Sequence, residues 1–257
     1  MLAFERVGSG PPLVLLHGVG HRRQAWYPIV ARVSRERELF LVDLPGHGES
    51  GPLPDGKPVL DVLRDELAGF LAEQGLDRPH IAGNSLGGRI ALEAGLLGMA
   101  ASVTALSPAG FWRSGLAFHY TKGLFQTIEA VGRRIGPQAP KLVKTARGRA
   151  LMFGWINAKP GNIDAELALG DFQAFTRARP AMHAVLAHPS TFVGQPDVPV
   201  TIGWGTRDLV LPPYQARVAR ATLPGAAHVR LPGCGHVPMA DDPELVAGVL
   251  LRGSAGK

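Results

Sequence analysis

Apolar residues along the first 110 positions gather in short runs that are separated by longer segments of helical periodicity. The runs lie at 13–16, 39–42, 81–82 and 103–106. Short, continuously apolar runs are typical of strands that are covered on both faces, because a strand with one solvated face alternates apolar and polar positions. The segments between them predict helices over 25–33, 59–74 and 86–97, each ended by Gly, Pro or a polar turn. Together they predict an α/β fold with a mostly parallel central sheet and helices on both faces.

The middle of the chain has a different pattern. Between residues 111 and 196 the strand signal gives way to short helical patterns that are interrupted by Gly-Pro, Lys-Pro-Gly and Arg-Pro breakers. The alternation then returns, with strands predicted at 200–204 and 228–231, helices at 213–221 and 243–251, and a loose tail at 252–257. We therefore expect a core formed by 1–110 and 197–257, with 111–196 inserted as a helical cap.

The expected cap is rich in aromatic residues. It holds seven of the ten Phe residues, together with Trp112, Tyr120 and Trp155. We expect most of them to form a small core of the cap itself and some to face a cleft, where an apolar lining suits an acyl chain or an aromatic leaving group.

Composition narrows the class of protein. A chain of 257 residues that is 46% hydrophobic and 19% charged can bury one large core. The single cysteine, Cys234, excludes an intrachain disulfide and is interpreted as small buried filler. The first residues do not resemble a signal peptide, and no apolar run approaches the roughly 18 residues of a membrane span. These features favour a cytoplasmic protein without a membrane span.

The net charge of +6 comes from an excess of arginine. The basic residues do not alternate with aromatic ones, as they do in nucleic-acid modules, so we attribute the excess to compositional bias and expect no nucleic-acid partner. His and carboxylate residues lack spacings such as His-x-x-x-His, so we expect neither a metal nor a cofactor. A small-molecule substrate is the expected partner.

The run Gly83-Asn84-Ser85-Leu86-Gly87 lies between a predicted strand and a predicted helix. A Gly-x-Ser-x-Gly pattern alone is weak, since roughly 0.15 matches are expected by chance in a chain of this composition. Its position at a strand-to-helix turn is what a nucleophile elbow requires. Ser85 is therefore a candidate nucleophile, and it needs a base and a group that orients the base.

The C-terminal part of the chain offers both groups. Asp208 follows the predicted strand 200–204, and His236 follows the predicted strand 228–231. Carboxyl ends of parallel strands meet at one edge of a sheet, which is also where Ser85 emerges. The chain order Ser, Asp, His is the order expected for this architecture.

With Ser85, Asp208 and His236 in this order, the chain resembles the α/β-hydrolase superfamily over nearly its full length. The run His17-Gly18-Val19-Gly20 resembles the family's oxyanion loop, 43–50 its turn after the next strand, and Gly235-His236-x-Pro238 its C-terminal histidine segment. The resemblance implies Ser85 as nucleophile, His236 as general base and then acid, and Asp208 as the carboxylate that orients the imidazole. It also implies an oxyanion hole formed by the backbone N–H groups of Val19 and Leu86.

Other polar residues near these motifs are interpreted as structural. His17 and His47 lie in tight glycine turns, where a structural role is expected. Asp241 and Asp242 are predicted to cap the closing helix. Asp43 is expected to hold the conformation of the turn over 43–50.

The leading hypothesis is a serine hydrolase that cleaves a carboxylic ester of a small to medium apolar substrate through an acyl-enzyme intermediate. An alternative is hydrolysis of a carbon-carbon bond in a meta-cleavage-type diketone, because relatives with that activity share Gly-Asn-Ser-x-Gly-Gly. Those relatives usually carry Trp where this chain has Val237. Arg177 and Arg179 of the cap are candidates to bind the substrate carboxylate, and no spacing argument selects either. The same triad also fits a cofactor-free perhydrolase or haloperoxidase, and the fold can serve as a ligand receptor.

Overall fold

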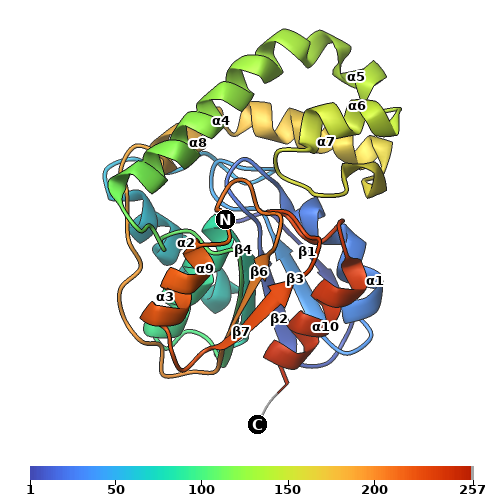
Figure 1. The fold of residues 1–257 in the computed structure, drawn as a ribbon. Coiled ribbons are helices and arrows are strands. Elements are labelled where there is room, and N and C mark those ends of the chain that lie inside the picture. The colour runs from blue at the N-terminus through green and yellow to red at the C-terminus, as the bar shows by residue number, and fades with distance from the viewer. Residues whose placement is uncertain (256–257) are drawn as a thin grey trace.

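The computed structural model describes residues 1–255 and contains one seven-stranded sheet of order β1-β3-β2-β4-β5-β6-β7 (Figure 1). The strands are β1 (Phe4–Val7), β2 (Pro12–Leu16), β3 (Glu38–Val42), β4 (His80–Asn84), β5 (Ser102–Leu106), β6 (Val200–Gly205) and β7 (Ala227–Leu231). All neighbouring pairs are parallel except β1 with β3. The predicted α/β class with a mostly parallel sheet is confirmed, whereas the antiparallel edge strand β1 was not predicted.

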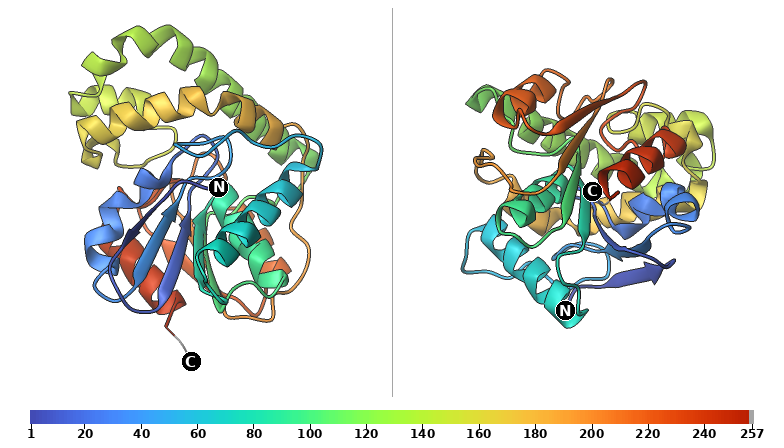
Figure 2. Two further views of the ribbon diagram at one scale, coloured as in Figure 1. Left: turned by 180° about the vertical axis from the view of Figure 1, so that it is seen from behind. Right: turned by 90° about the horizontal axis from the view of Figure 1, so that it is seen from below.

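Helices cover both faces of the sheet (Figures 1 and 2). Helices α1 (Tyr27–Val33) and α10 (Pro243–Gly253) pack together on one face, while α2 (Val59–Glu73), α3 (Leu86–Leu96) and α9 (Gln215–Thr222) lie on the other. The predicted helices agree with these within two residues at each end, and a 3-10 helix over Arg23–Trp26 precedes α1.

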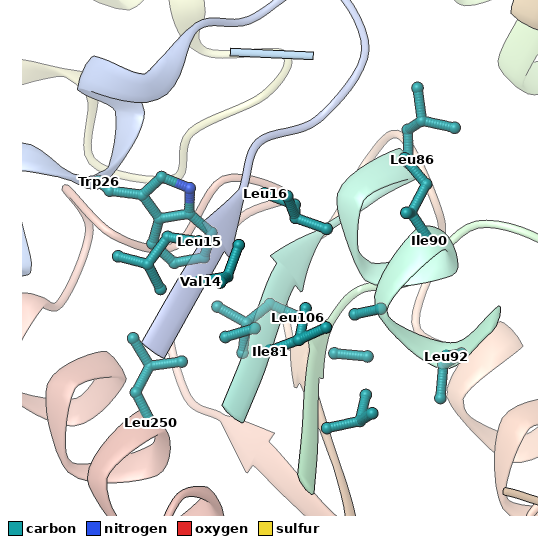
Figure 3. Packing of buried hydrophobic residues seen from close by; sticks show 14 of the residues in the cluster. Val14, Leu15, Leu16, Trp26, Ile81, Leu86, Ile90, Leu92, Leu106 and Leu250 are labelled. Atoms are coloured by element: carbon teal, nitrogen blue, oxygen red, sulfur yellow. The ribbon is translucent and has the colours of Figure 1, made fainter. Parts of the chain in front are cut away.

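The central strands explain the continuous apolar runs. Residues Leu13 to Leu16 of β2 are each at most 1% exposed, because both faces of this strand are covered. In Figure 3, Leu15 lies beside Trp26, and Leu16 lies on the side of α3 with Leu86 and Ile90. Each such side chain contributes about 1.5–3 kcal/mol by leaving water.

Five α-helices and no strand occur between β5 and β6 in the described residues, and they lie across one end of the sheet (Figure 1). They are α4 (Gly115–Ile135), α5 (Ala139–Leu142), α6 (Ala146–Phe153), α7 (Ala165–Arg177) and α8 (Arg179–Val185). The helix α4 is a single long helix that ends at the Gly136-Pro137 breaker.

Aromatic residues of this helical segment serve two cores. Phe125, Trp155 and Phe175 contact one another with ring centroids 5.5–6.3 Å apart. Phe111 instead packs against Trp204 of β6 and against Phe192, at 6.4 and 5.7 Å. The expectation that most of the aromatics form a small core of the segment itself is therefore wrong: Phe111, Phe125 and Phe192 belong to the main core of the protein. Within residues 1–255, the aromatics packed against the small second cluster are Phe153 and Phe172.

The C-terminal end is more ordered than the sequence predicts. Helix α10 continues to Gly253, and Ser254 is buried. Arg37 donates from Nε to Ser254 Oγ at 3.0 Å and from Nη2 to the Ser254 carbonyl at 2.9 Å. The predicted loose tail is thus wrong for 252–254, and its last two residues lie outside the described part of the chain.

Candidate active site

Ser85 occupies the single residue between β4 and α3. Its backbone has φ 56° and ψ −113°, a conformation that residues other than glycine rarely adopt and that costs about 1–3 kcal/mol. The surrounding main chain fixes it: the Ser85 N–H donates to Leu106 at 2.9 Å, and its carbonyl accepts from Arg89 and Ala109 at 3.0 and 3.1 Å. The strain is therefore held by backbone hydrogen bonds, and the side chain projects from a sharp turn.

Two glycines allow this turn. A Cβ atom on Gly83 would fall on the carbonyl of Gly87, and one on Gly87 would fall on the carbonyl of Leu16. Across the turn, a Cβ atom on Gly18 would lie 3.2 Å from Cβ of Ser85. The Gly-x-Ser-x-Gly spacing is therefore a requirement of main-chain packing at this place.

Asp208 and His236 meet beyond the ends of β6 and β7. Oδ2 of Asp208 accepts a hydrogen bond from His236 Nδ1 at 2.9 Å, and Oδ1 accepts from the N–H groups of Val210 and Leu211 at 2.9 and 2.8 Å. Both side chains are buried. With the proton on Nδ1, the neutral imidazole leaves Nε2 as a hydrogen-bond acceptor, which is the tautomer that a general base needs.

Asn84 connects the serine turn with the histidine loop. Its Nδ2 donates to the carbonyl of His236 at 2.9 Å and to that of Leu106 at 3.1 Å. Because Asn84 precedes Ser85, these bonds hold the two loops against each other at the same edge of the sheet. Sequence reasoning gave Asn84 no such role, although a polar residue at the end of a buried strand is a usable signal.

A second carboxylate supports the histidine loop. Asp241 is buried and accepts from the N–H groups of Gly235, Ala158 and Lys159, at 2.7, 3.0 and 2.6 Å. Asp242 alone caps α10, where it accepts from Leu245 at 3.0 Å. The predicted capping role is thus right for Asp242 and wrong for Asp241, because Asp241 ties the histidine loop to residues 158–159 of the helical segment.

Two buried histidines shape the loop that contains Val19. His17 Nε2 accepts from the Leu44 N–H and His47 Nε2 accepts from the Gly20 N–H, both at 3.0 Å. Burial lowers the pKa of both imidazoles, so they are neutral and act as fixed hydrogen-bond partners. The predicted structural role of His17 and His47 agrees with these contacts.

Asp43 fixes the neighbouring turn. It is fully buried, pairs with the Arg23 guanidinium, and accepts from the N–H groups of Arg23 and Glu49 at 2.6 and 3.0 Å. Its carboxylate is thus occupied in holding the chain, as the sequence predicts.

Val19 lies in the loop after β2, and Leu86 directly follows Ser85 in the chain. Neither backbone N–H group donates a hydrogen bond to any acceptor within residues 1–255. Both residues line the same cavity as Ser85. Free donors beside a hydroxyl are the groups that can stabilise a developing negative charge.

The cavity beside Ser85 has a volume of about 220 Å³ and is mostly apolar. The helical segment contributes Trp112, Phe118 and Phe125 to its lining, so some of the aromatics do face the cleft. Arg89 also lines it, but its guanidinium donates to Glu93 at 2.7 Å and to the Thr191 carbonyl at 3.1 Å. The positive charge of Arg89 is therefore balanced within the protein.

Arg177, Arg179 and Cys234 do not line the cavity beside Ser85. Arg179 pairs with Glu129 at 2.7 Å, and neither Arg177 nor Arg179 lines the cavity. Cys234 is fully buried, and burial raises the pKa of its thiol to about 11, so the predicted role as buried filler is confirmed.

Within residues 1–255, no helix is long and apolar enough to cross a membrane. In the same part of the chain, no group of three or more His, Cys, Asp or Glu side chains is arranged to hold a metal ion.

Comparison with known proteins places this geometry in a family. A model described as the alpha/beta hydrolase family matches residues 13–249. The chain is 26% identical to a pimeloyl-[acyl-carrier protein] methyl ester esterase of Nitrosomonas europaea, over 94% of each chain. It is 27% identical to a putative non-heme haloperoxidase of a Mycobacterium phage, covering 97% of this chain and 89% of the relative. The structure of a thermophilic esterase from Thermogutta terrifontis superposes with a TM-score of 0.73 at 22% identity, covering 98% of this chain and 92% of that one.

The close approach at Gly83 gives a stability prediction. Gly83→Ala places a methyl group on the Gly87 carbonyl and should lower the free energy of unfolding by about 3 kcal/mol or more. Gly69→Ala is the matched control, since Gly69 is an exposed residue of α2 with no atom near its Cβ position. That change should raise the free energy of unfolding by about 0.5–1 kcal/mol. Urea denaturation compares the two, and equal stabilities would contradict the packing argument.

The two adjacent aspartates give a second prediction. Asp241→Ala leaves three backbone N–H groups without their acceptor and should lower the free energy of unfolding by about 3 kcal/mol or more. Asp242→Ala removes one helix cap and should cost about 1 kcal/mol. Chemical denaturation of both variants measures the difference. A larger loss for Asp242→Ala than for Asp241→Ala would refute the assignment of Asp241 to the histidine loop.

Proposed function

Because the chain belongs to the alpha/beta hydrolase family, we propose that it is a serine esterase whose catalytic residues are Ser85, His236 and Asp208. The observation that carries the proposal is the buried Asp208–His236 hydrogen bond of 2.9 Å, held by Asn84 beside the strained turn of Ser85. A hydroxyl becomes an effective nucleophile only with such a base and orienting group. The esterase relative and the esterase structure support the ester as substrate class.

In the proposed mechanism, His236 Nε2 takes the Ser85 hydroxyl proton while Oγ attacks the ester carbonyl. Asp208 stabilises the resulting imidazolium and keeps its orientation. The N–H groups of Val19 and Leu86 donate to the oxyanion, and each such donor is worth about 3 kcal/mol. The imidazolium then gives its proton to the departing alcohol, which leaves Ser85 acylated. Water activated by His236 releases the acid and restores the enzyme.

The substrate class follows from the cavity. Residues 111–196 act in this proposal as a cap that encloses one side of the cleft, since Trp112, Phe118 and Phe125 line it together with Ser85. An apolar cavity of about 220 Å³ favours a small to medium apolar acyl or alkoxy group over a sugar or a highly charged group.

Ester cleavage is preferred over carbon-carbon hydrolysis for a structural reason. The diketone substrates of the latter carry a carboxylate, which needs an unpaired cation in the cavity. Arg89 is balanced by Glu93, and Arg179 is paired with Glu129 outside the cavity. A ring-cleavage dienoate compared with a simple ester as substrate separates the two reactions.

Replacing the nucleophile tests the proposal directly. Ser85→Ala should lower kcat for a nitrophenyl ester by about 10⁴–10⁶-fold, because the acyl-enzyme cannot form. Ser190→Ala is the control, since Ser190 lines the same cavity and should retain near wild-type turnover. A fluorophosphonate probe should label Ser85 in the wild-type chain, as read by peptide mass spectrometry. Turnover by Ser85→Ala at the wild-type rate, with intact folding by circular dichroism, would disprove the proposal.

The apolar cavity predicts a preference among substrates. In a series of nitrophenyl esters, kcat/KM should rise from acetate to medium-length acyl chains, because each buried CH₂ contributes about 0.8 kcal/mol, and should fall once the chain exceeds the cavity. A hemi-ester with a terminal carboxylate should be a poorer substrate than its neutral analogue of equal length. Faster hydrolysis of the charged ester would contradict an apolar acyl site.

A further inference from the structure

A second cavity is lined by residues of β6, α9 and β7, at the edge of the sheet. It has a volume of about 420 Å³ and shares no lining residue with the cavity beside Ser85. Because β7 is the last strand of the sheet, nothing among the neighbouring strands closes this side. We call it the edge groove.

The strand register explains which side chains reach the edge groove. His228 pairs with Ile202 and Arg230 pairs with Trp204, and all four residues line the groove. Residues two apart on a strand share a face, so Ile202 and Trp204 lie beside His228 and Arg230, but both are buried, at 1% and 4% exposed. The apolar surface open to the groove comes from Pro213, Ala216 and Val229, which we call its apolar floor.

Helix α9 supplies the facing wall. Ala216, Arg217 and Arg220 line the groove, and residues three and four apart lie on one side of a helix. The groove therefore combines an apolar floor with three arginines and a histidine that come from two elements.

The positive charge of the edge groove has no counter-charge. Within residues 1–255, Arg217, Arg220 and Arg230 form no ion pair with a carboxylate. The sequence from 209 to 240 contains these three arginines and no Asp or Glu. Asp208, the preceding carboxylate, is buried and bonded through both oxygens. An arginine-rich composition accounts for the arginines but not for the absence of acids.

Polar groups beside the arginines add hydrogen-bonding capacity. His228 lines the groove and donates from Nε2 to the Leu223 carbonyl at 2.9 Å. Thr206 Oγ1 lines one end of the groove and accepts from the Gly233 N–H at 2.8 Å, which leaves its own proton to donate.

We propose that the edge groove is a binding site for a small organic phosphate, with the phosphate held by the arginines and the organic part on the apolar floor. Guanidinium groups present paired N–H donors that match phosphate oxygens and keep their charge at all physiological pH values. The apolar floor offers a surface that inorganic ions do not use. This site is independent of the chemistry proposed for Ser85.

Calorimetric titration of the full chain at low salt tests the site with three probes: inorganic phosphate, pyrophosphate and phenyl phosphate. Pyrophosphate and phenyl phosphate should both bind more tightly than inorganic phosphate, the first through charge and the second through the floor. In the double variant Arg217→Gln with Arg230→Gln, all three dissociation constants should rise about tenfold or more.

The matched control is Arg134→Gln with Arg147→Gln, which removes the same charge from two exposed arginines of the helical segment. This control should leave the dissociation constants unchanged, and Ser85→Ala should bind as the wild type does. Because all four arginines are exposed, both double variants should fold, as thermal unfolding verifies. Absence of binding by all three probes, or equal losses in both double variants, would overturn the proposal.

Discussion

Two main-chain segments approach closely where β4 turns into α3, and the candidate site depends on this approach. The carbonyls of Leu16 and Gly87 occupy the space that side chains at 87 and 83 would need. This approach lets the chain reverse within one residue and holds Ser85 at φ 56°. The sheet supplies the rigidity, since Leu16 belongs to the buried neighbouring strand β2. A strained residue persists only where surrounding structure fixes it.

Buried polar groups then position the loops around this turn. Asn84 holds the histidine loop, Asp241 joins that loop to the helical segment, and Asp43 with the two neutral histidines fixes the loop of Val19. Each group makes at least one hydrogen bond to a backbone atom of another segment. Such bonds are costly to leave unmade in a buried place, so they define one arrangement of loops that have no regular secondary structure.

Much of the fold could be predicted because its signals are local. Apolar runs marked six of the seven strands, and breakers marked the ends of the helices around them. The short edge strand β1 was not predicted because its last two residues are exposed and its partner β3 lies more than thirty residues away. The C-terminal end of α10 was not predicted because its partner is also distant in the chain. Ser254 is held by Arg37, which lies 217 residues earlier.

The sequence by itself determined the glycine spacing around Ser85, the order of Ser85, Asp208 and His236, and the class of the sheet, because backbone sterics and strand burial act over a few residues. Only the tertiary structure decided that Asp241 supports the histidine loop and Asp242 caps the helix, although the two are adjacent and chemically identical. The structure alone shows which arginines form ion pairs. Arg89 pairs with Glu93 and Arg179 with Glu129, whereas the arginines of the edge groove pair with no carboxylate within residues 1–255. The partner of a charge is set by segments that are distant in the chain, and sequence spacing does not contain that information.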